Sequence, residues 1–98
     1  MTDSKTVLVT GSSSGFGKLI AETLLAQGHT VAATMRNLEG KNASQAKELE
    51  EFAGGQPGKL HLLDLDVTDD ASIQSAVDTL IDAEGEIDVV VNNAGYGA

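Results

Sequence analysis

A glycine-rich turn near the start of the chain constrains the fold more than any other feature. Residues 10–17 read Thr-Gly-Ser-Ser-Ser-Gly-Phe-Gly, after an apolar run at residues 6–9 and before a helical pattern that reaches Gln27. Glycines let a backbone turn tightly and come close to a bound group. The helix that follows offers free N–H groups and a partial positive charge at its first turn. A strand, a glycine turn and a helix in this order predict a site for a phosphate group.

Apolar runs and amphipathic patterns alternate along the rest of the chain. The runs predict strands at residues 5–10, 30–35, 60–65 and 87–92. The periodic patterns predict helices at residues 15–27 and 43–52, and a third that starts at Thr68 or Asp69 and ends at Gly85. In this third helix Asp70 lies in the first turn, and apolar residues recur at helical spacing at Ile73, Ala76, Val77, Leu80 and Ile81.

Strands that alternate with helices predict an α/β fold with a parallel sheet and right-handed crossovers. In the doubly wound arrangement the four strands take the order 3-2-1-4, with helices on both faces of the sheet. Strands one and four then lie side by side, and ligands bind beyond their carboxyl ends. The loop after strand one holds the glycine turn, and the loop after strand four reads Asn92-Asn93-Ala94-Gly95. We expect the two loops to meet at one crevice.

Composition narrows the possible partners. The chain has 98 residues, which fit one small domain, and no cysteine, which excludes disulfides and thiolate sites. The formal net charge of −9 is uneven: residues 1–47 sum to +2 and residues 48–98 to −11. This acidity argues against nucleic acid and anionic membranes as partners. The sequence has no long apolar run and no signal-peptide pattern at its start, so we expect a soluble, cytoplasmic protein.

Three motifs, each after its own strand, resemble one family. They are the Thr-Gly-x-x-x-Gly-x-Gly turn, Asp66-Val67 after strand three, and Asn92 to Gly95 after strand four. Together they resemble the N-terminal, cofactor-binding half of the short-chain dehydrogenases/reductases, over residues 5–97. The resemblance implies a Rossmann-like NAD(P)-binding domain over residues 1–98. It also implies an oxidoreductase that moves a hydride between a nicotinamide and a carbonyl or alcohol carbon.

The resemblance also implies which residues hold the cofactor. The turn would line the pyrophosphate and the adenosine ribose through Gly11, Ser12, Ser13, Ser14, Gly15, Phe16 and Gly17. Asp66 and Val67 would hold the adenine, whereas Asn92, Ala94 and Gly95 would border the ribose next to the nicotinamide. Asn93 would instead connect strand four with its neighbours. Without the resemblance, these residues also fit a plain tight turn, a strand-end acid and a turn after a strand.

The tip of strand two indicates which dinucleotide binds. Family members that use NAD generally carry an acid there, which grips the ribose hydroxyls, but this chain reads Met35-Arg36-Asn37. The guanidinium of Arg36 fits a 2′-phosphate, so we expect NADP, with Arg36 and Asn37 at the ribose. Lys41 could assist Arg36. Glu39 lies three residues further on, and Ser14 stands where many NADP-binding members have a basic residue; both features count against NADP.

Catalysis is not expected from residues 1–98 alone. The family's catalytic Ser and Tyr-x-x-x-Lys lie further along a family member, and Tyr96 is the only tyrosine here. We therefore expect the front portion of a longer oxidoreductase, homo-oligomeric when complete, with no catalytic and no metal-ligating residue in this part. A non-catalytic nucleotide sensor and a purely structural Rossmann-like fragment are the alternatives. Ser12 to Ser14 have no histidine at a recognisable spacing for a hydrolase, and His29 and His61 are expected to be structural.

Overall fold

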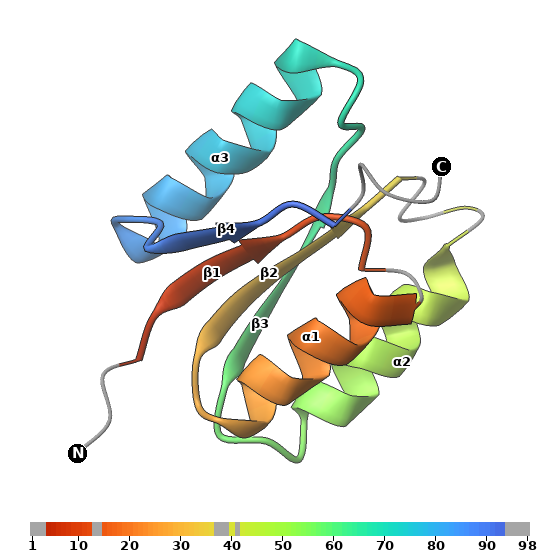
Figure 1. Ribbon diagram of the computed structural model, residues 1–98, viewed down its shortest axis with the longest axis vertical. Helices are drawn as coiled ribbons and strands as arrows, with labels where there is room; N and C mark the ends of the chain where they lie inside the picture. Colours follow the sequence, from red (N-terminus) through yellow and green to blue (C-terminus); the bar gives the residue numbers. More distant parts are fainter. Residues whose placement is uncertain (1–3, 13–14, 37–39, 41, 94–98) are drawn as a thin grey trace.

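The structure, a computed structural model, describes residues 4–12, 15–36, 40 and 42–93. Within them strands and helices alternate in the predicted order (Figure 1). Every boundary lies within two residues of its predicted position. The strands are β1 (Thr6–Val9), β2 (Thr30–Met35), β3 (Lys59–Asp64) and β4 (Val89–Val91), and the helices are α1 (Gly15–Ala26), α2 (Ala43–Ala53) and α3 (Asp70–Glu84).

The four strands form one parallel sheet in the order β3-β2-β1-β4, which confirms the predicted topology. β1 lies inside the sheet, where Val7 is in register with Val31 of β2 and with Val89 of β4. Because all strands run the same way, their carboxyl ends share one edge of the sheet. The loops after β1 and β4 therefore leave the sheet next to each other.

Helices cover both faces of the sheet, as predicted (Figure 1). Figure 1 shows α1 and α2 together on one face and α3 on the other. Side chains alternate along β1 between the two layers, because successive residues of a strand point to opposite faces. Val7 and Val9 belong to the core under α1 and α2, whereas Leu8 belongs to the core under α3.

The two cores differ in size. The core under α1 and α2 consists of Val7, Val9, Ala21, Leu25, Val31, Ala33, Met35, Ala46 and Leu49. Among the described residues, the buried members of the core under α3 are Leu8, Ala32 and Leu80. This uneven burial leaves the α3 side of the sheet more open, and it bears on the site described below.

The ends of α3 show how local chemistry sets an element's length. Of the two predicted N-caps, Asp69 takes the role, and its Oδ1 accepts from the N–H of Ala71 at 3.0 Å. Gly85 ends the helix in the left-handed conformation, with φ 88°, and its N–H donates to the carbonyl of Ile81. A side chain at such a φ would be strained, so glycine suits this position.

β4 is the shortest strand and forms one edge of the sheet. It begins after Asp88, whose N–H donates to the carbonyl of Thr6 and whose carboxylate accepts from the N–H of Thr6, each at 2.8 Å. The side chains of Val89 and Val90 are 44% and 58% exposed. The structure thus has the apolar strand edge that the order 3-2-1-4 implies.

Among the described residues, none of the helices has the length and apolar character that a membrane crossing requires.

Candidate nucleotide-binding site

Two glycines set the path of the turn after β1. Gly11 and Gly15 have φ angles of 66° and 63°, in the left-handed region. A residue with a side chain is disfavoured there by roughly 1–2 kcal/mol. With respect to the part of the chain that the structure describes, a Cβ built on Gly15 would meet no atom within 4 Å, so the space over this backbone is open. The start of α1 is therefore open to a bound group, as a phosphate site requires.

The third glycine of the turn has a different role. A Cβ on Gly17 would lie far inside contact distance of the Gly11 carbonyl oxygen, and 2.9 Å from Nδ2 of Asn93. Gly17 therefore lets α1 pack directly against the backbone of the turn. This close packing brings the helix N-terminus up to the loop that follows β4.

Ser12 lies inside the turn rather than on its surface. Its side chain is fully buried, and its hydroxyl donates to the carbonyl of Val9 at 3.0 Å. Its N–H donates to the carbonyl of Thr34 at 3.0 Å, and the hydroxyl of Thr34 also donates to Val9. Ser12 thus fixes the turn to β1 and β2. Ser13 and Ser14 lie outside the described residues.

Hydrogen bonds join the loop after β4 to the loop after β1. The N–H of Thr10 donates to the Val91 carbonyl at 3.0 Å, and the Thr10 hydroxyl lies 3.2 Å from Oδ1 of Asn92. The N–H of Asn93 donates to the Thr10 hydroxyl at 2.9 Å, and its Nδ2 donates to the Gly11 carbonyl at 3.3 Å. Asn93 therefore connects the two loops, as its predicted role requires. Ala94 and Gly95 lie outside the described residues.

Arg36 follows the carboxyl end of β2, at the same end of the sheet as the loops after β1 and β4. Its carbonyl oxygen accepts from Nδ2 of Asn42, which holds the backbone at the strand end. Its side chain is 65% exposed, and its Nε lies 4.0 Å from Oδ2 of Asp66. This pair joins the loop after β2 to the loop after β3. Asn37 lies outside the described residues.

Asp66 is held in a defined orientation. Its Oδ1 accepts from the N–H and the hydroxyl of Thr68, at 2.9 and 2.7 Å, and its own N–H donates to Oγ of Ser72 at 2.9 Å. The hydrogen bonds from Thr68, above all the one from its hydroxyl, lower the pKa of the Asp66 carboxyl, and the charge of Arg36 adds to this. The carboxyl is therefore ionised at neutral pH, with Oδ2 turned toward Arg36.

Val67 lines a small hollow of about 190 Å³ beside Asp66. The hollow lies on the α3 side of the sheet, between the ends of β1 and β4 and the first turns of α3. It is mainly apolar, with two polar residues at its rim, and is lined by Leu8, Thr10, Leu65, Val67, Ile73, Val90 and Asn92. The smaller core of this face leaves room for it. A flat apolar group with a polar edge would fit such a surface.

Phe16 is the most exposed large apolar side chain of the described residues, at 75%. It belongs to the first turn of α1, directly after Gly15. An aromatic ring in this position lies next to the free N–H groups of the helix start. The turn therefore presents both polar backbone and an apolar surface to solvent.

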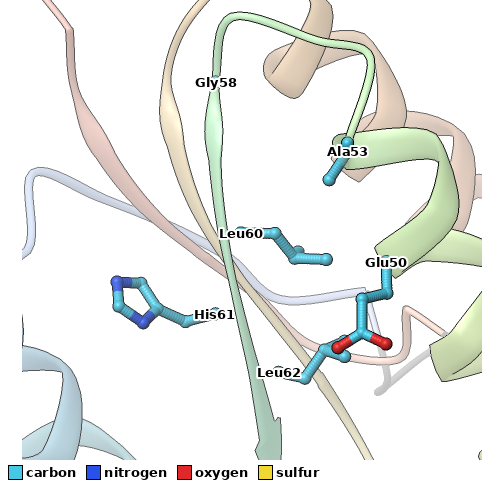
Figure 2. Close-up of a pocket in the computed structure, with 7 residues that line it drawn as sticks. Glu50, Ala53, Gly58, Leu60, His61 and Leu62 are labelled. Atoms are coloured by element: carbon cyan, nitrogen blue, oxygen red, sulfur yellow. The ribbon is translucent and has the colours of Figure 1, made fainter.

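A larger groove of about 500 Å³ lies away from this site, along the outer edge of β3 (Figure 2). It runs between β3 and the end of α2, near Gly58 at the amino end of the strand. Figure 2 shows Leu60 and Leu62 on the side of α2 and His61 on the opposite side of the strand. The groove lacks the converging loops of the site at the carboxyl ends.

Both histidines are held by neighbouring groups. Nδ1 of His29 accepts from the N–H of Lys5 at 3.1 Å, and Nε2 of His61 lies 2.7 Å from Oε2 of Glu84. These contacts agree with the structural roles expected from the sequence. Within the part of the chain that the structure describes, there is no group of three acidic or histidine side chains that could hold a metal.

Comparison with known proteins decides the family. The model of the short-chain dehydrogenase family matches residues 5–98. The chain belongs to this family. The expected correspondence to the N-terminal portion of a short-chain dehydrogenase/reductase is thereby confirmed.

Similar proteins include reductases and dehydrogenases. The chain is 41% identical to a 3-ketodihydrosphingosine reductase from Bacteroides thetaiotaomicron over 91 residues, which are 93% of this chain and 28% of that protein. A crystal structure of a short-chain dehydrogenase/reductase from Burkholderia xenovorans superposes with a TM-score of 0.84 at 25% identity, over 95% of this chain and 37% of that one. An alcohol dehydrogenase from Thermococcus sibiricus, solved in complex with 5-hydroxy-NADP, gives a TM-score of 0.78 at 25% identity, over 90% and 36%. The chain thus spans about a third of the length of these relatives.

Proposed function

We propose that this chain is the NADP(H)-binding part of a cytoplasmic short-chain dehydrogenase/reductase. The whole protein would transfer a hydride between the nicotinamide and a carbonyl or alcohol carbon. The observation that carries the proposal is the convergence, in two pairs, of the four loops that follow the carboxyl ends of the strands. The turn after β1 meets the loop after β4 through Asn93, and Arg36 after β2 meets Asp66 after β3.

The residues present fit a dinucleotide. The backbone over Gly15 is open, and α1 begins at this glycine, so the helix N-terminus can accept the pyrophosphate. Gly11 and Gly17 shape the cradle, with Ser13 and Ser14 proposed as further contacts. Ser12 acts from inside the turn, since its hydroxyl donates to Val9.

The adenine would bind beside Asp66 and Val67. The Asp66 carboxylate can accept a hydrogen bond from an exocyclic amine, and Val67 lines the apolar hollow beside it. Asn92, at the rim of the same hollow, would border the ribose next to the nicotinamide together with Ala94 and Gly95. The proposal thus assigns the polar residues to the edges of the ligand and the apolar ones to its faces.

Arg36 supports NADP rather than NAD. Its guanidinium is largely exposed at the strand end where the family reads the adenosine ribose. A planar guanidinium suits a phosphate, and phosphate contacts from a charged donor are strong hydrogen bonds. The relative from Thermococcus sibiricus was solved with an NADP derivative, which agrees with this choice. Asn37 is proposed as a second contact to the ribose.

The bound nicotinamide would donate or accept the hydride, and the chain's own residues would bind and orient the dinucleotide. The family's catalytic Ser and Tyr-x-x-x-Lys do not occur in residues 1–98. We therefore assign the proton transfer and the binding of the carbonyl substrate to groups outside these residues. Positioning of the cofactor is a large part of such a reaction, because it replaces a chance encounter with a fixed geometry.

Substitution of Arg36 tests the cofactor assignment. Arg36→Ala should weaken NADP binding by about 1.5–3 kcal/mol, because one charge-assisted phosphate contact is lost, and should leave NAD nearly unchanged. Titration calorimetry with both dinucleotides measures the two affinities. Lys5→Ala is the matched control, because it removes the same charge from an exposed position just before the amino end of β1, away from the carboxyl ends of the strands. An equal loss for both dinucleotides would show that Arg36 does not read the 2′-phosphate.

A further inference from the structure

The contact between Arg36 and Asp66 joins two loops that are thirty residues apart in sequence. The distance of 4.0 Å from Nε to Oδ2 makes it an ion pair without a direct hydrogen bond. The side chains are 65% and 36% exposed. Exposed pairs of this kind add little to the stability of a fold. Their effect on the position of a side chain can still matter for a ligand.

Asp66 offers one fixed oxygen to Arg36. Its other oxygen, Oδ1, is taken by both donors of Thr68, and the Asp66 backbone is fixed by Ser72 in the first turns of α3. These bonds arise within the loop and α3, so the carboxylate is in place without a ligand. The carboxylate therefore presents Oδ2 to Arg36 in a fixed position.

Arg36 turns a particular part of its guanidinium toward this point. The nitrogen nearest to the carboxylate is Nε, so the terminal Nη1 and Nη2 groups are not used by the pair. The backbone of Arg36 is also fixed, through the bond from Asn42 to its carbonyl oxygen. Since Nε is the nitrogen that faces Asp66, the terminal amino groups are, with respect to the described residues, the donors available to a phosphate.

We propose that Asp66 is a positioning residue for Arg36, and that it sharpens the preference for a nucleotide with a 2′-phosphate. The inference rests on the proposed function, since it assumes that Arg36 meets this phosphate. A free arginine loses much rotamer freedom when it binds a ligand, and prior ordering reduces that loss. The negative charge of Asp66 opposes a phosphate only weakly, because Arg36 neutralises it and both groups are open to water.

The test uses the full-length protein and two nucleotides that differ in one group, adenosine 2′,5′-bisphosphate and adenosine 5′-monophosphate. Asp66→Asn removes the charge and keeps an oxygen that can accept from Thr68. Any lost contact to the adenine affects both nucleotides, so it cancels in the ratio of their dissociation constants. We expect Asp66→Asn to lower the preference for the bisphosphate about threefold, the size typical of an exposed ion pair. In an Arg36→Ala background the same change should no longer lower the ratio, because the pair is already absent.

Asp69→Asn is the matched control, because it removes an equal charge from the same loop and asparagine remains a good N-cap for α3. It should not change the preference. If Arg36→Ala abolishes the preference but Asp66→Asn leaves it or raises it, the positioning role is wrong and the proposed function stands. An equal loss with Asp69→Asn would overturn the positioning role in favour of a general charge effect. If Arg36→Ala has no effect on the preference, both proposals are wrong.

Discussion

Within the glycine turn, the small residues are required for three different physical reasons. Gly11 and Gly15 provide positive φ angles, whereas Gly17 provides room for close packing of α1. Ser12 has a third role. It is buried, and its hydroxyl donates a hydrogen bond to the carbonyl of Val9. The sequence pattern predicts the turn as a unit but does not separate these roles.

Gly17→Ala should disrupt the turn. The added Cβ would meet the Gly11 carbonyl, which is backbone and cannot move without shifting the loop. Forcing a methyl group into such a contact typically costs about 1–3 kcal/mol of unfolding free energy. Urea denaturation followed by circular dichroism measures the loss.

Gly54→Ala is the control for this substitution. Gly54 has a helical φ of −60°, and an added Cβ would come no closer than 3.4 Å to a neighbouring atom. This change should leave the stability unchanged or raise it by about 0.4–1 kcal/mol. Equal midpoints for Gly17→Ala and the unmodified chain would show that the turn relaxes easily.

Site residues could be predicted from the sequence where a local motif marks them. The hydrogen-bond and ion-pair partners of these residues could not. The motif identifies Asp66, but the sequence gives no sign that Thr68 and Ser72 fix it or that Arg36 faces it. Thr68 was one of two candidate caps for α3, yet its hydroxyl donates to Asp66 instead. Such contacts depend on how two loops meet, which composition and spacing do not reveal.

At the scale of elements, one acid joins the amino end of β3 to the end of α3. Oε2 of Glu84 lies 2.8 Å from Nζ of Lys59 and 2.7 Å from Nε2 of His61. Hydrogen bonds from Lys59 and His61 lower the pKa of the Glu84 carboxyl below its ordinary value of 4.5. Helix periodicity predicts α3 well, but this contact between elements was not foreseen.

The Glu84 contact should make stability depend on pH. A carboxyl whose pKa is lowered in the folded state stabilises the fold above its unfolded pKa, and the effect is lost as pH falls through the folded pKa. Glu84→Gln should therefore be less stable than the unmodified chain at pH 7. The difference should shrink as the pH is lowered below about 4.5. Urea midpoints between pH 7 and pH 3 measure it.

Glu86→Gln provides the comparison for this pH series, because it removes the same charge from an exposed position two residues away. Its stability difference from the unmodified chain should vary less with pH. A Glu84→Gln difference that stays constant from pH 7 to pH 3 would contradict the role of the ionised carboxylate.

At the scale of the whole molecule, the parallel direction of the strands follows from the alternation of elements, because parallel strands need helical crossovers, and the order 3-2-1-4 follows from the doubly wound arrangement that the motifs indicate. This is why the sheet order and the two helical layers could be predicted before any contact was known. The unequal size of the two cores could not be predicted, since it depends on which apolar side chains of the strands point to each face of the sheet. That unevenness produces the hollow beside Val67.

The open edge of β4 leads to the last prediction, which concerns the 98-residue chain by itself. Val89 and Val90 are exposed on this edge, and Phe16, Leu19 and Ile81 are the other large apolar side chains of the described residues that are exposed. An exposed apolar strand edge favours pairing with another chain. The relatives are about three times as long, so we propose that further chain covers this edge in the whole protein. Without it, we expect the 98-residue chain to associate as its concentration rises, which sedimentation velocity measures.

Val89→Lys should weaken this association. A lysine on an edge strand opposes pairing through its charge and its need for water. Loss of a partly buried valine contact in the pair should raise the dissociation constant about tenfold, which corresponds to about 1.4 kcal/mol. Val89 is preferable to Val90 for this test, because Val90 lines the hollow of the candidate site.

Ser75→Lys is the control for this substitution. It adds the same charge at an exposed position of α3 and should leave the association unchanged. If the unmodified chain stays monomeric at every concentration while its circular dichroism shows a folded α/β protein, the β4 edge is not an association surface, and the fold is stable with this edge open to water.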